Sequence, residues 1–271
     1  MKRIRERLWR SGRTNPFFQD GFAKLVDSPN QSEIWWHSVP LPDGDRINGH
    51  NPDKDLQFKM WRAMQIASDG GLAGKRVLDI GANDGFFTLA AIMAGAKEVT
   101  AMDMAWATWP RNIQYASRAW NVAPTIITAD FRTYDFQERY DVIFFLGVLY
   151  HLEDVFSCMR TLGRLLEAQG VLYLETQMSQ IQSDLPIFEY ASDIYPTIAP
   201  QDKQSLSGVG ISNYLFPNDH AMLNLAHSYE FHCEALDGRS NVYTKEHPTR
   251  RFYRLSKRSP ASLPGPVRDD R

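Results

Sequence analysis

The chain of 271 residues is 43% hydrophobic and 12% aromatic, which is enough apolar material to bury a substantial core. Its formal net charge of -2 excludes a general attraction to polyphosphate, so nucleic-acid binding would require a local basic face. The sequence has no apolar run of membrane-spanning length, and its two cysteines have no metal-binding or disulfide spacing, so we expect a cytoplasmic protein.

The two ends of the chain lack long hydrophobic periodicity. Residues 1–51 begin with a basic segment and carry scattered prolines and aromatic residues, and we interpret them as an extension that is a candidate for substrate contact. Asn51 and Pro52 suit the N-cap and first turn of a helix that runs to about Ala67. The main domain is expected over residues 52–258, and the proline-rich residues 259–271 predict a disordered tail.

From residue 74 onward, short apolar runs alternate with amphipathic stretches, as in repeated strand-helix-strand units with a parallel sheet. A helix is expected over residues 86–94, where apolar residues recur on one face and Gly95 provides a stop. The last two strand-like runs suit a hairpin that closes the sheet, and residues 177–216, which lack periodicity, suit a lid. The predicted strands cover residues 76–80, 98–102, 125–128, 140–145, 171–175, 229–236 and 250–255.

A glycine-rich turn follows the first predicted strand. Asp79 lies near the end of that strand, and Gly81 and Gly85 bracket Asn83 and Asp84 just before the predicted helix. Glycine allows a backbone to approach a ligand closely, and the amino terminus of a helix favours an anionic group. By itself this spacing equally suits a tight turn that binds nothing.

Two further acids stand at the ends of the next two strands. Asp103 follows the turn by about 20 residues, where a carboxylate can accept the hydroxyl hydrogens of a ribose. Asp130 precedes Phe131, whose ring offers a surface for an adenine. Each acid alone suits a solvated loop or a helix cap. Their joint position at the carboxyl edge of a parallel sheet predicts a nucleoside cofactor site.

The motif from Asp79 to Gly85, with Asp103 and Asp130, resembles motif I and its successors in class I methyltransferases, which use S-adenosyl-L-methionine. Dinucleotide dehydrogenases compete with this interpretation, but Asn83 stands at their second glycine position. The resemblance implies a Rossmann-like α/β fold with a mostly parallel seven-stranded sheet, helices on both faces and an antiparallel carboxyl-terminal hairpin. The cofactor-binding residues that it implies are Asp79, Gly81, Asn83, Asp84, Gly85, Asp103, Met104, Asp130, Phe131, Leu146 and Gly147.

A narrower resemblance rests on residues 145–154, which read Phe-Leu-Gly-Val-Leu-Tyr-His-Leu-Glu-Asp. This segment is similar to the tRNA wobble-uridine carboxymethyltransferases and their many methyltransferase relatives, and residues 170–176 and 213–217 resemble the same family. The carboxymethylating enzymes carry a lysine where this chain has Ser38, and they have a longer amino-terminal region. These two departures favour ordinary S-adenosylmethionine and weaken the case for tRNA.

The acceptor is expected beyond the fourth strand, where Gly147 permits close approach and Tyr150 and His151 follow. Methyl transfer from a sulfonium needs an in-line nucleophile and the removal of its proton. With an ordinary pKa of about 6.5, His151 suits the catalytic base, although it equally suits a helix cap or a backbone hydrogen bond. The resemblance implies that Tyr150 lies near the reacting end of the cofactor.

Several aromatic and basic residues are candidates for the acceptor pocket, although most such residues pack in a core or lie on the surface. Of the late arginine pair, Arg251 is expected to reach the pocket in preference to Arg250. The predicted substrate-contacting residues are Trp36, His37, Tyr190, Tyr214 and Arg251.

The sequence therefore favours a methyltransferase that acts on a small-molecule acceptor, with O-methylation of a sugar or secondary metabolite as the leading hypothesis. A tRNA-modifying methyltransferase is the runner-up, followed by a non-catalytic cofactor-binding relative and a Rossmann oxidoreductase. We expect no membrane partner and no metal, because Glu153, Asp154 and His151 are near neighbours in the chain without a distant further ligand.

Overall fold

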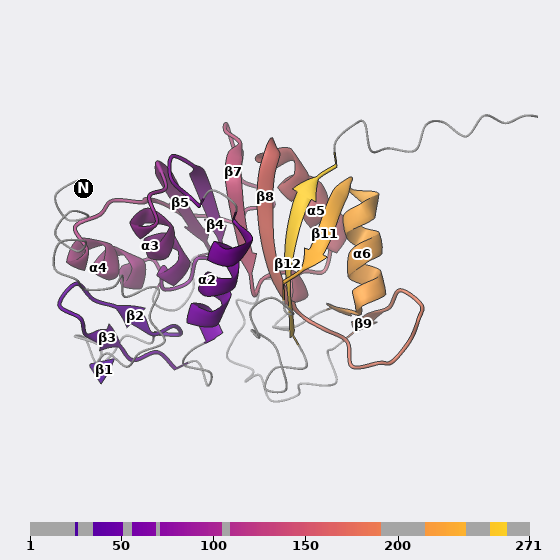
Figure 1. The fold of residues 1–271 in the computed structure, drawn as a ribbon, viewed down its shortest axis with the longest axis horizontal. Coiled ribbons are helices and arrows are strands. Elements are labelled where there is room, and N and C mark those ends of the chain that lie inside the picture. The colour runs from indigo at the N-terminus through magenta and orange to yellow at the C-terminus, as the bar shows by residue number, and fades with distance from the viewer. Residues whose placement is uncertain are drawn as a thin grey trace, which may run out of the picture.

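The computed structural model describes residues 25–26, 35–50, 56–68, 71–104, 109–190, 215–236 and 250–258. Their main feature is a seven-stranded sheet in the order β11-β12-β8-β7-β4-β5-β6 (Figure 1). The strands from β4 to β8 pair with one another in parallel, whereas β12 is antiparallel to both β8 and β11. The strands are β4 (Arg76–Ile80), β5 (Glu98–Asp103), β6 (Thr125–Thr128), β7 (Tyr140–Leu146), β8 (Leu166–Gln177), β11 (Phe231–Ala235) and β12 (Arg250–Lys257).

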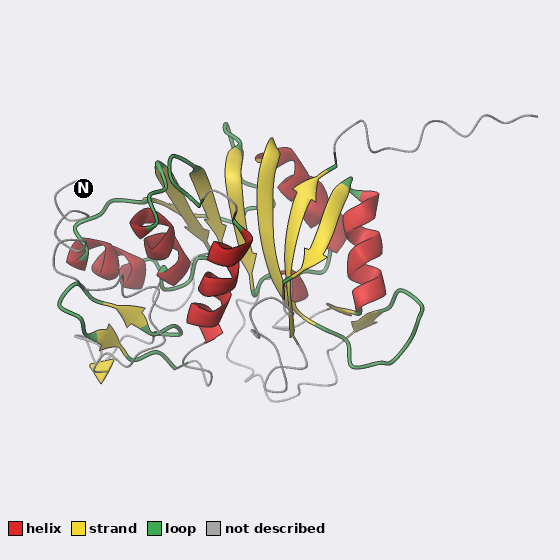
Figure 2. Ribbon diagram, in the orientation of Figure 1, coloured by secondary structure: helices red, strands yellow, loops and turns green. Residues whose placement is uncertain are grey.

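Helices cover both faces of this sheet (Figure 2). Successive strand residues point to opposite faces, so Val142 and Phe144 pack with α2 and α3, while Ile143 and Phe145 pack with α5 and α6. Two buried faces explain why the strands read as continuous apolar runs. The helices are α2 (Leu56–Ala67), α3 (Phe86–Met93), α4 (Arg111–Ala119), α5 (Val155–Leu165) and α6 (Asp219–Ser228), with a 3-10 turn, η2 (Leu149–His151).

The predicted Rossmann-like class I fold is confirmed, and the differences lie at the ends of elements. The strand expected from residue 229 begins at Phe231, because Tyr229 and Glu230 close the end of α6 through backbone hydrogen bonds. β8 is longer than expected, since β7 and β12 pair with it on either side. Residues 51–55, which contain the expected start of the first helix, lie outside the described residues, as does the predicted tail.

Two small sheets lie outside the central one. β1 (Leu25–Val26), β2 (Val39–Pro40) and β3 (Arg46–Ile47) form the first, and β9 (Phe188–Tyr190) pairs with β10 (Leu215–Pro217) in the second. The second sheet joins the two described ends of the expected lid, whose residues 191–214 are not described. None of the described helices has both the length and the apolar character needed to cross a membrane.

Asn218 connects the start of α6 to the segment after β8. As N-cap it accepts hydrogen bonds from the backbone N–H groups of Ala221 at 2.9 Å and Ile187 at 3.1 Å. Its Nδ2 donates to the carbonyl oxygens of Leu185 at 2.7 Å and Ser183 at 3.3 Å. This side chain is buried, so each of these groups would lose its partner without gaining water.

We expect Asn218→Ala to lower the free energy of unfolding by about 2–4 kcal/mol, since it removes an N-cap and leaves buried groups unpaired. The matched control is Asp154→Ala, which removes an exposed N-cap of α5 whose hydrogen bonds go to Phe156 and Ser157 in the first turn of the same helix and should cost about 1 kcal/mol. Urea unfolding of both variants measures the difference. Equal losses would show that the bonds to residues 183–187 contribute nothing.

Candidate active site

The glycine turn of residues 81–85 begins at the carboxyl end of β4 and leads directly into α3. Its backbone is left-handed at Gly81 (φ 75°), Asn83 (φ 47°) and Gly85 (φ 82°). Gly81 N–H donates to the carbonyl oxygen of Met102 at 2.9 Å, and Asn83 N–H donates to Asp103 Oδ2 at 2.9 Å. The turn is therefore bound to the neighbouring strand β5 at two points.

Neighbouring side chains press on both glycines of this turn. A Cβ atom at Gly81 would overlap Val148 Cγ2, and one at Gly85 would lie 2.5 Å from Ile113 Cγ1. Glycine at these positions is thus required by tight packing against the protein itself, in addition to the positive φ. The sequence suggested only close approach to a ligand.

Asp103 ends β5 beside the turn. Its Oδ2 accepts the N–H of Asn83, and its Oδ1 accepts the N–H of Met104 at 2.8 Å. An ionised carboxylate offers about four lone-pair sites in all, which is the acceptor chemistry that a pair of hydroxyl groups requires. This capacity suits the ribose of a nucleoside cofactor.

Asp79 lies beneath the turn. It is buried, and its Oδ2 accepts a 2.6 Å hydrogen bond from the Thr88 hydroxyl of α3. Burial raises the pKa of this carboxyl to about 7, although the Thr88 hydrogen bond acts in the opposite direction. Asp79 therefore joins α3 to β4, and any effect on a cofactor would pass through the turn.

Asp84 also has its carboxylate filled by protein donors. Oδ2 accepts the backbone N–H groups of Trp36 and His37, and Oδ1 accepts Nδ2 of Asn112 on α4 at 2.7 Å. Burial raises the pKa of Asp84 to about 6. The predicted site residues Trp36, His37 and Asp84 are thus neighbours in space, and Asn112 is a participant that no sequence motif indicated.

The acid after β6 has a local partner. Asp130 forms an ion pair with Arg132, whose Nη2 lies 2.6 Å from Asp130 Oδ2. Burial opposes ionisation, but the hydrogen bonds and charge of Arg132 outweigh it and lower the pKa of Asp130. Phe131 is buried and packs edge to face on Phe145, with ring centroids 5.4 Å apart. Its ring therefore belongs to the core beneath the edge, which is a structural reason for an aromatic at this position.

A partly buried ion pair between Arg250 and the buried Glu175 lies at the carboxyl end of β7 and β8, beside Gly147. Arg250 Nε and Nη2 both donate to the Glu175 carboxylate, and Nη2 donates to Tyr150 Oη at 3.2 Å. A Cβ atom at Gly147 would lie 3.5 Å from Tyr150 Oη and 3.6 Å from Glu175 Oε2. Gly147, Tyr150, Glu175 and Arg250 therefore form one cluster, here called the Tyr150 cluster.

The structure places Arg250 in the Tyr150 cluster and Arg251 on a separate cavity of about 590 Å³ that residues 178–184 also line, so the expectation that Arg251 contacts the acceptor stays a prediction. Adjacent strand residues point to opposite faces, and Arg251 forms an ion pair with Asp219 at the start of α6, with a distance of 3.1 Å. Glu175 was not recognised from the sequence. The signal was a single charged residue at the end of a buried apolar strand, where a charge requires a partner.

His151 does not have the ordinary pKa that its sequence position suggested. Burial of its imidazole, reinforced by the charge of Arg250, lowers the pKa of His151 to about 3. Its ring packs on Tyr150 at a centroid distance of 4.2 Å. Burial raises the pKa of the Tyr150 phenol, so both side chains are neutral at physiological pH.

The remaining predicted substrate residues are dispersed. Trp36 is 45% exposed beside Asp84, while the His37 ring packs near Phe87, and burial lowers the pKa of His37 to about 4. Tyr190 is exposed at the end of β9. Tyr214 lies outside the described residues.

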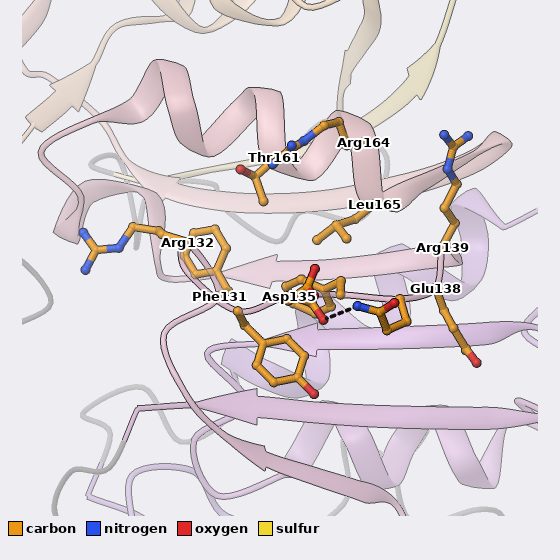
Figure 3. A pocket seen from close by; sticks show the side chains of 11 residues that line it. Phe131, Arg132, Asp135, Glu138, Arg139, Thr161, Arg164 and Leu165 are labelled. Carbon is orange, nitrogen blue, oxygen red and sulfur yellow. Dashed lines mark hydrogen bonds between the residues drawn. The ribbon is translucent and has the colours of Figure 1, made fainter.

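A separate cavity of about 280 Å³ lies between residues 131–139 and α5 (Figure 3). Arg132, Arg139 and Arg164 line it together with Asp135 and Glu138. It contains neither the glycine turn nor any residue of the Tyr150 cluster. The cavity is therefore distinct from the edge that carries the glycine turn and Asp103.

The comparisons with known proteins agree with this geometry. A family model described as a methyltransferase domain matches residues 54–241. The tRNA U34 carboxymethyltransferase of Campylobacter hominis is 30% identical over 136 residues, which cover 47% of this chain and 47% of that protein. The ubiquinone biosynthesis O-methyltransferase of Pseudomonas savastanoi pv. phaseolicola is 33% identical over 155 residues, covering 57% of this chain and 62% of that protein. The chain thus spans about half to three-fifths of the length of these curated relatives.

Among solved structures, the N-terminal domain of EvdMO1 in the presence of SAH and D-fucose has a TM-score of 0.58 and 18% identity. The match covers 84% of this chain and 93% of that chain, and it supports the fold. The strand order and the acids at the sheet edge define a Rossmann-like nucleoside-binding protein. The chain belongs to the methyltransferase domain family, in the class I group that uses S-adenosylmethionine.

Replacing Gly85 with alanine tests the packing of the turn. We expect Gly85→Ala to lower the free energy of unfolding by about 2–5 kcal/mol, because left-handed strain adds to overpacking against Ile113. Gly74 has a similar φ of 76° and nothing within 4 Å of an added Cβ. Gly74→Ala should therefore cost only about 1–2 kcal/mol in the same urea titration. Similar losses in both variants would argue against crowding by Ile113.

Proposed function

We propose that this protein transfers a methyl group from S-adenosylmethionine to an oxygen atom of a small molecule, such as a sugar or secondary metabolite. The observation that carries the proposal is the Tyr150 cluster, which lies at the same sheet edge as the glycine turn and Asp103. One end of this edge suits the nucleoside, and the other offers a neutral polar surface to an acceptor.

The residues at the nucleoside end fit the cofactor. Asp103 is a carboxylate at the end of β5 beside the glycine turn, which suits the ribose hydroxyls, and the start of α3 suits the methionine carboxylate of the cofactor. Gly147 leaves room for close approach beside Tyr150. When bound, S-adenosylmethionine supplies an electrophilic methyl group on a sulfonium.

The residues at the acceptor end suit a hydroxyl group. Tyr150 Oη accepts a hydrogen bond from Arg250, and its raised pKa keeps the phenol proton available for donation. His151 remains a neutral imidazole that can accept a hydrogen bond. A donor and an acceptor side by side can orient the lone pair of a hydroxyl oxygen, which is what in-line transfer requires.

The charge of the site favours an uncharged acceptor over a phosphate backbone. Arg132, Arg250 and Arg251 are each paired with a carboxylate, from Asp130, Glu175 and Asp219. Their charges are therefore already neutralised, which reduces attraction to polyphosphate. Among the relatives, the Pseudomonas protein is an O-methyltransferase of ubiquinone biosynthesis, and the EvdMO1 domain was crystallised with D-fucose present.

A tRNA-modifying activity is the second candidate, because the Campylobacter relative is a tRNA U34 carboxymethyltransferase. Incubation of the protein with methyl-labelled S-adenosylmethionine separates the two acceptors. We expect label to enter a small-molecule extract and not total RNA. Asp103→Ala is the control, and it should weaken cofactor affinity about 10- to 100-fold in calorimetry, since it removes hydrogen bonds to a charged group.

Label that enters only RNA would refute the small-molecule assignment. Cofactor binding without transfer to a broad panel of acceptors would indicate a non-catalytic relative. Binding of a nicotinamide dinucleotide in place of S-adenosylmethionine would refute the methyltransferase reaction itself.

The pH dependence tests the role of His151. With a pKa of about 3, His151 is neutral throughout the usual assay range, so kcat/KM should show no ionisation of this residue between about pH 5.5 and about pH 8.5. His151→Ala should lower kcat by about 10- to 100-fold without changing the shape of the profile. The exposed His227 on α6 provides the control His227→Ala, with unchanged kcat. If kcat/KM of the wild type falls below about pH 6.5 and this fall is absent in His151→Ala, His151 would be a catalytic base with an ordinary pKa.

A further inference from the structure

We propose that Asp84 is a positioning residue that holds residues 35–50 against the glycine turn, so that this segment forms one wall of the cofactor site. The inference deepens the proposed function and rests on it. According to this proposal, Asp84 takes no part in the chemical step. It acts through the backbone of Trp36 and His37.

The first argument is the geometry of the carboxylate. Oδ2 receives two backbone N–H groups, at 2.5 Å from Trp36 and 2.8 Å from His37, and Oδ1 receives Asn112 Nδ2 at 2.7 Å. Trp36 and Asp84 are 48 positions apart in the chain, so these bonds join distant segments. Hydrogen bonds to an ionised group are the strongest that a neutral donor can make.

The second argument is the place of Asp84 in the turn. The residue before it, Asn83, donates its N–H to Asp103, and the residue after it, Gly85, starts α3. The backbone that carries Asp84 is thus the same backbone that would cradle the cofactor. Any movement of residues 35–50 relative to Asp84 would be transmitted to both neighbours.

The third argument is that residues 35–50 form a compact unit. Gly49 N–H donates to Ser38 Oγ at 3.2 Å, and His50 Nδ1 lies 3.0 Å from the carbonyl oxygen of Trp35. A Cβ atom at Gly49 would overlap the carbonyl carbon of His37, so the two sides of this loop touch. Trp120 and Gln57 bind the carbonyl oxygens of Pro40 and Ser38, and Asp84 holds the side of the loop that faces the glycine turn through two amide groups.

Within the described part of the chain, residues 35–50 also carry an exposed aromatic side chain and an unpaired polar atom beside the glycine turn. Trp36 is 45% exposed immediately beside the anchored amides. The Nδ1 atom of His37 is buried and has no hydrogen-bond partner among the described residues. The His37 ring lies near Phe86 and Phe87 in the first turn of α3, where the cofactor carboxylate is expected. A polar ligand at this place would give Nδ1 a partner.

Hydrogen exchange and calorimetry on the full chain test the inference, with S-adenosylhomocysteine as the ligand. Asp84→Ala should raise the Kd for S-adenosylhomocysteine by about 5- to 150-fold, the usual range of coupling between two sites. It should also accelerate exchange of the Trp36 and His37 amides. The kcat at saturating S-adenosylmethionine should change much less than KM.

Reciprocity supplies a measurement that needs no mutation. If docking of residues 35–50 favours the ligand, then S-adenosylhomocysteine must slow exchange of the Trp36 and His37 amides in the unmodified protein. Wild-type protein that binds the ligand with no change at these amides would overturn the inference and leave the proposed function standing. Wild-type protein that does not bind the ligand at all would instead refute the proposed function.

A hydrogen-bond swap distinguishes positioning from general stability. In the double variant Asp84→Asn with Asn112→Asp, the amide oxygen at position 84 can accept both backbone N–H groups and its Nδ2 can donate to the new carboxylate. This variant should recover the ligand affinity to within about threefold of wild type. Asn112→Ala removes one of the three hydrogen bonds to Asp84, so it should raise the Kd less than Asp84→Ala does. It replaces Asp84→Ala in these measurements if that variant does not fold.

Asn218→Ala is the stability control, because it destabilises a distant part of the sheet without touching the turn. Its affinity for S-adenosylhomocysteine and its exchange at Trp36 and His37 should match wild type. Loss of affinity in this control equal to that in Asp84→Ala would show that Asp84 acts only through stability. An unchanged Kd in Asp84→Ala, with faster exchange at both amides, would exclude residues 35–50 from the cofactor site.

Discussion

The tight packing of the glycine turn is the constraint on which the rest of the site depends. Val148 and Ile113 press on it from the two sides, so the turn can lie between them only if Gly81 and Gly85 have no side chains. The same packing brings β5, η2 and α4 to one point. Asp103 ends β5, Tyr150 lies in η2 and Asn112 lies in α4. The packing of the glycine turn against β5, Val148 and Ile113 therefore sets how far apart these three residues lie.

The buried carboxylates at this edge are stabilised by hydrogen bonds and ion pairs within the protein. Asp79 is bound to Thr88, Asp84 to two backbone amides and Asn112, and Glu175 to Arg250. A buried charge without such partners would be costly, so these contacts hold the elements in register. Asp103 accepts the backbone N–H groups of Asn83 and Met104, so it fixes the glycine turn relative to the end of β5.

The acceptor end has a different electrostatic character. Glu175 neutralises Arg250, and the low pKa of His151 and the raised pKa of Tyr150 leave both rings uncharged. An arginine with no carboxylate beside it would attract anions to this place. The pairing instead produces a polar but uncharged surface. The low pKa of His151 comes first from burial, and the Arg250 guanidinium adds to it, because both disfavour an imidazolium.

The sequence by itself determined the class I fold, the positions of its strands and the acids at the ends of β4, β5 and β6. Local periodicity, glycine and strand ends are properties of short segments, and parallel strands necessarily gather their carboxyl ends at one edge. Only the tertiary structure decided which side chains meet there. It placed Arg250 beside Glu175 and Arg251 beside Asp219, and burial lowered the pKa of His151 far below its ordinary value. Burial and contacts between distant residues cause these effects, and no short segment contains that information.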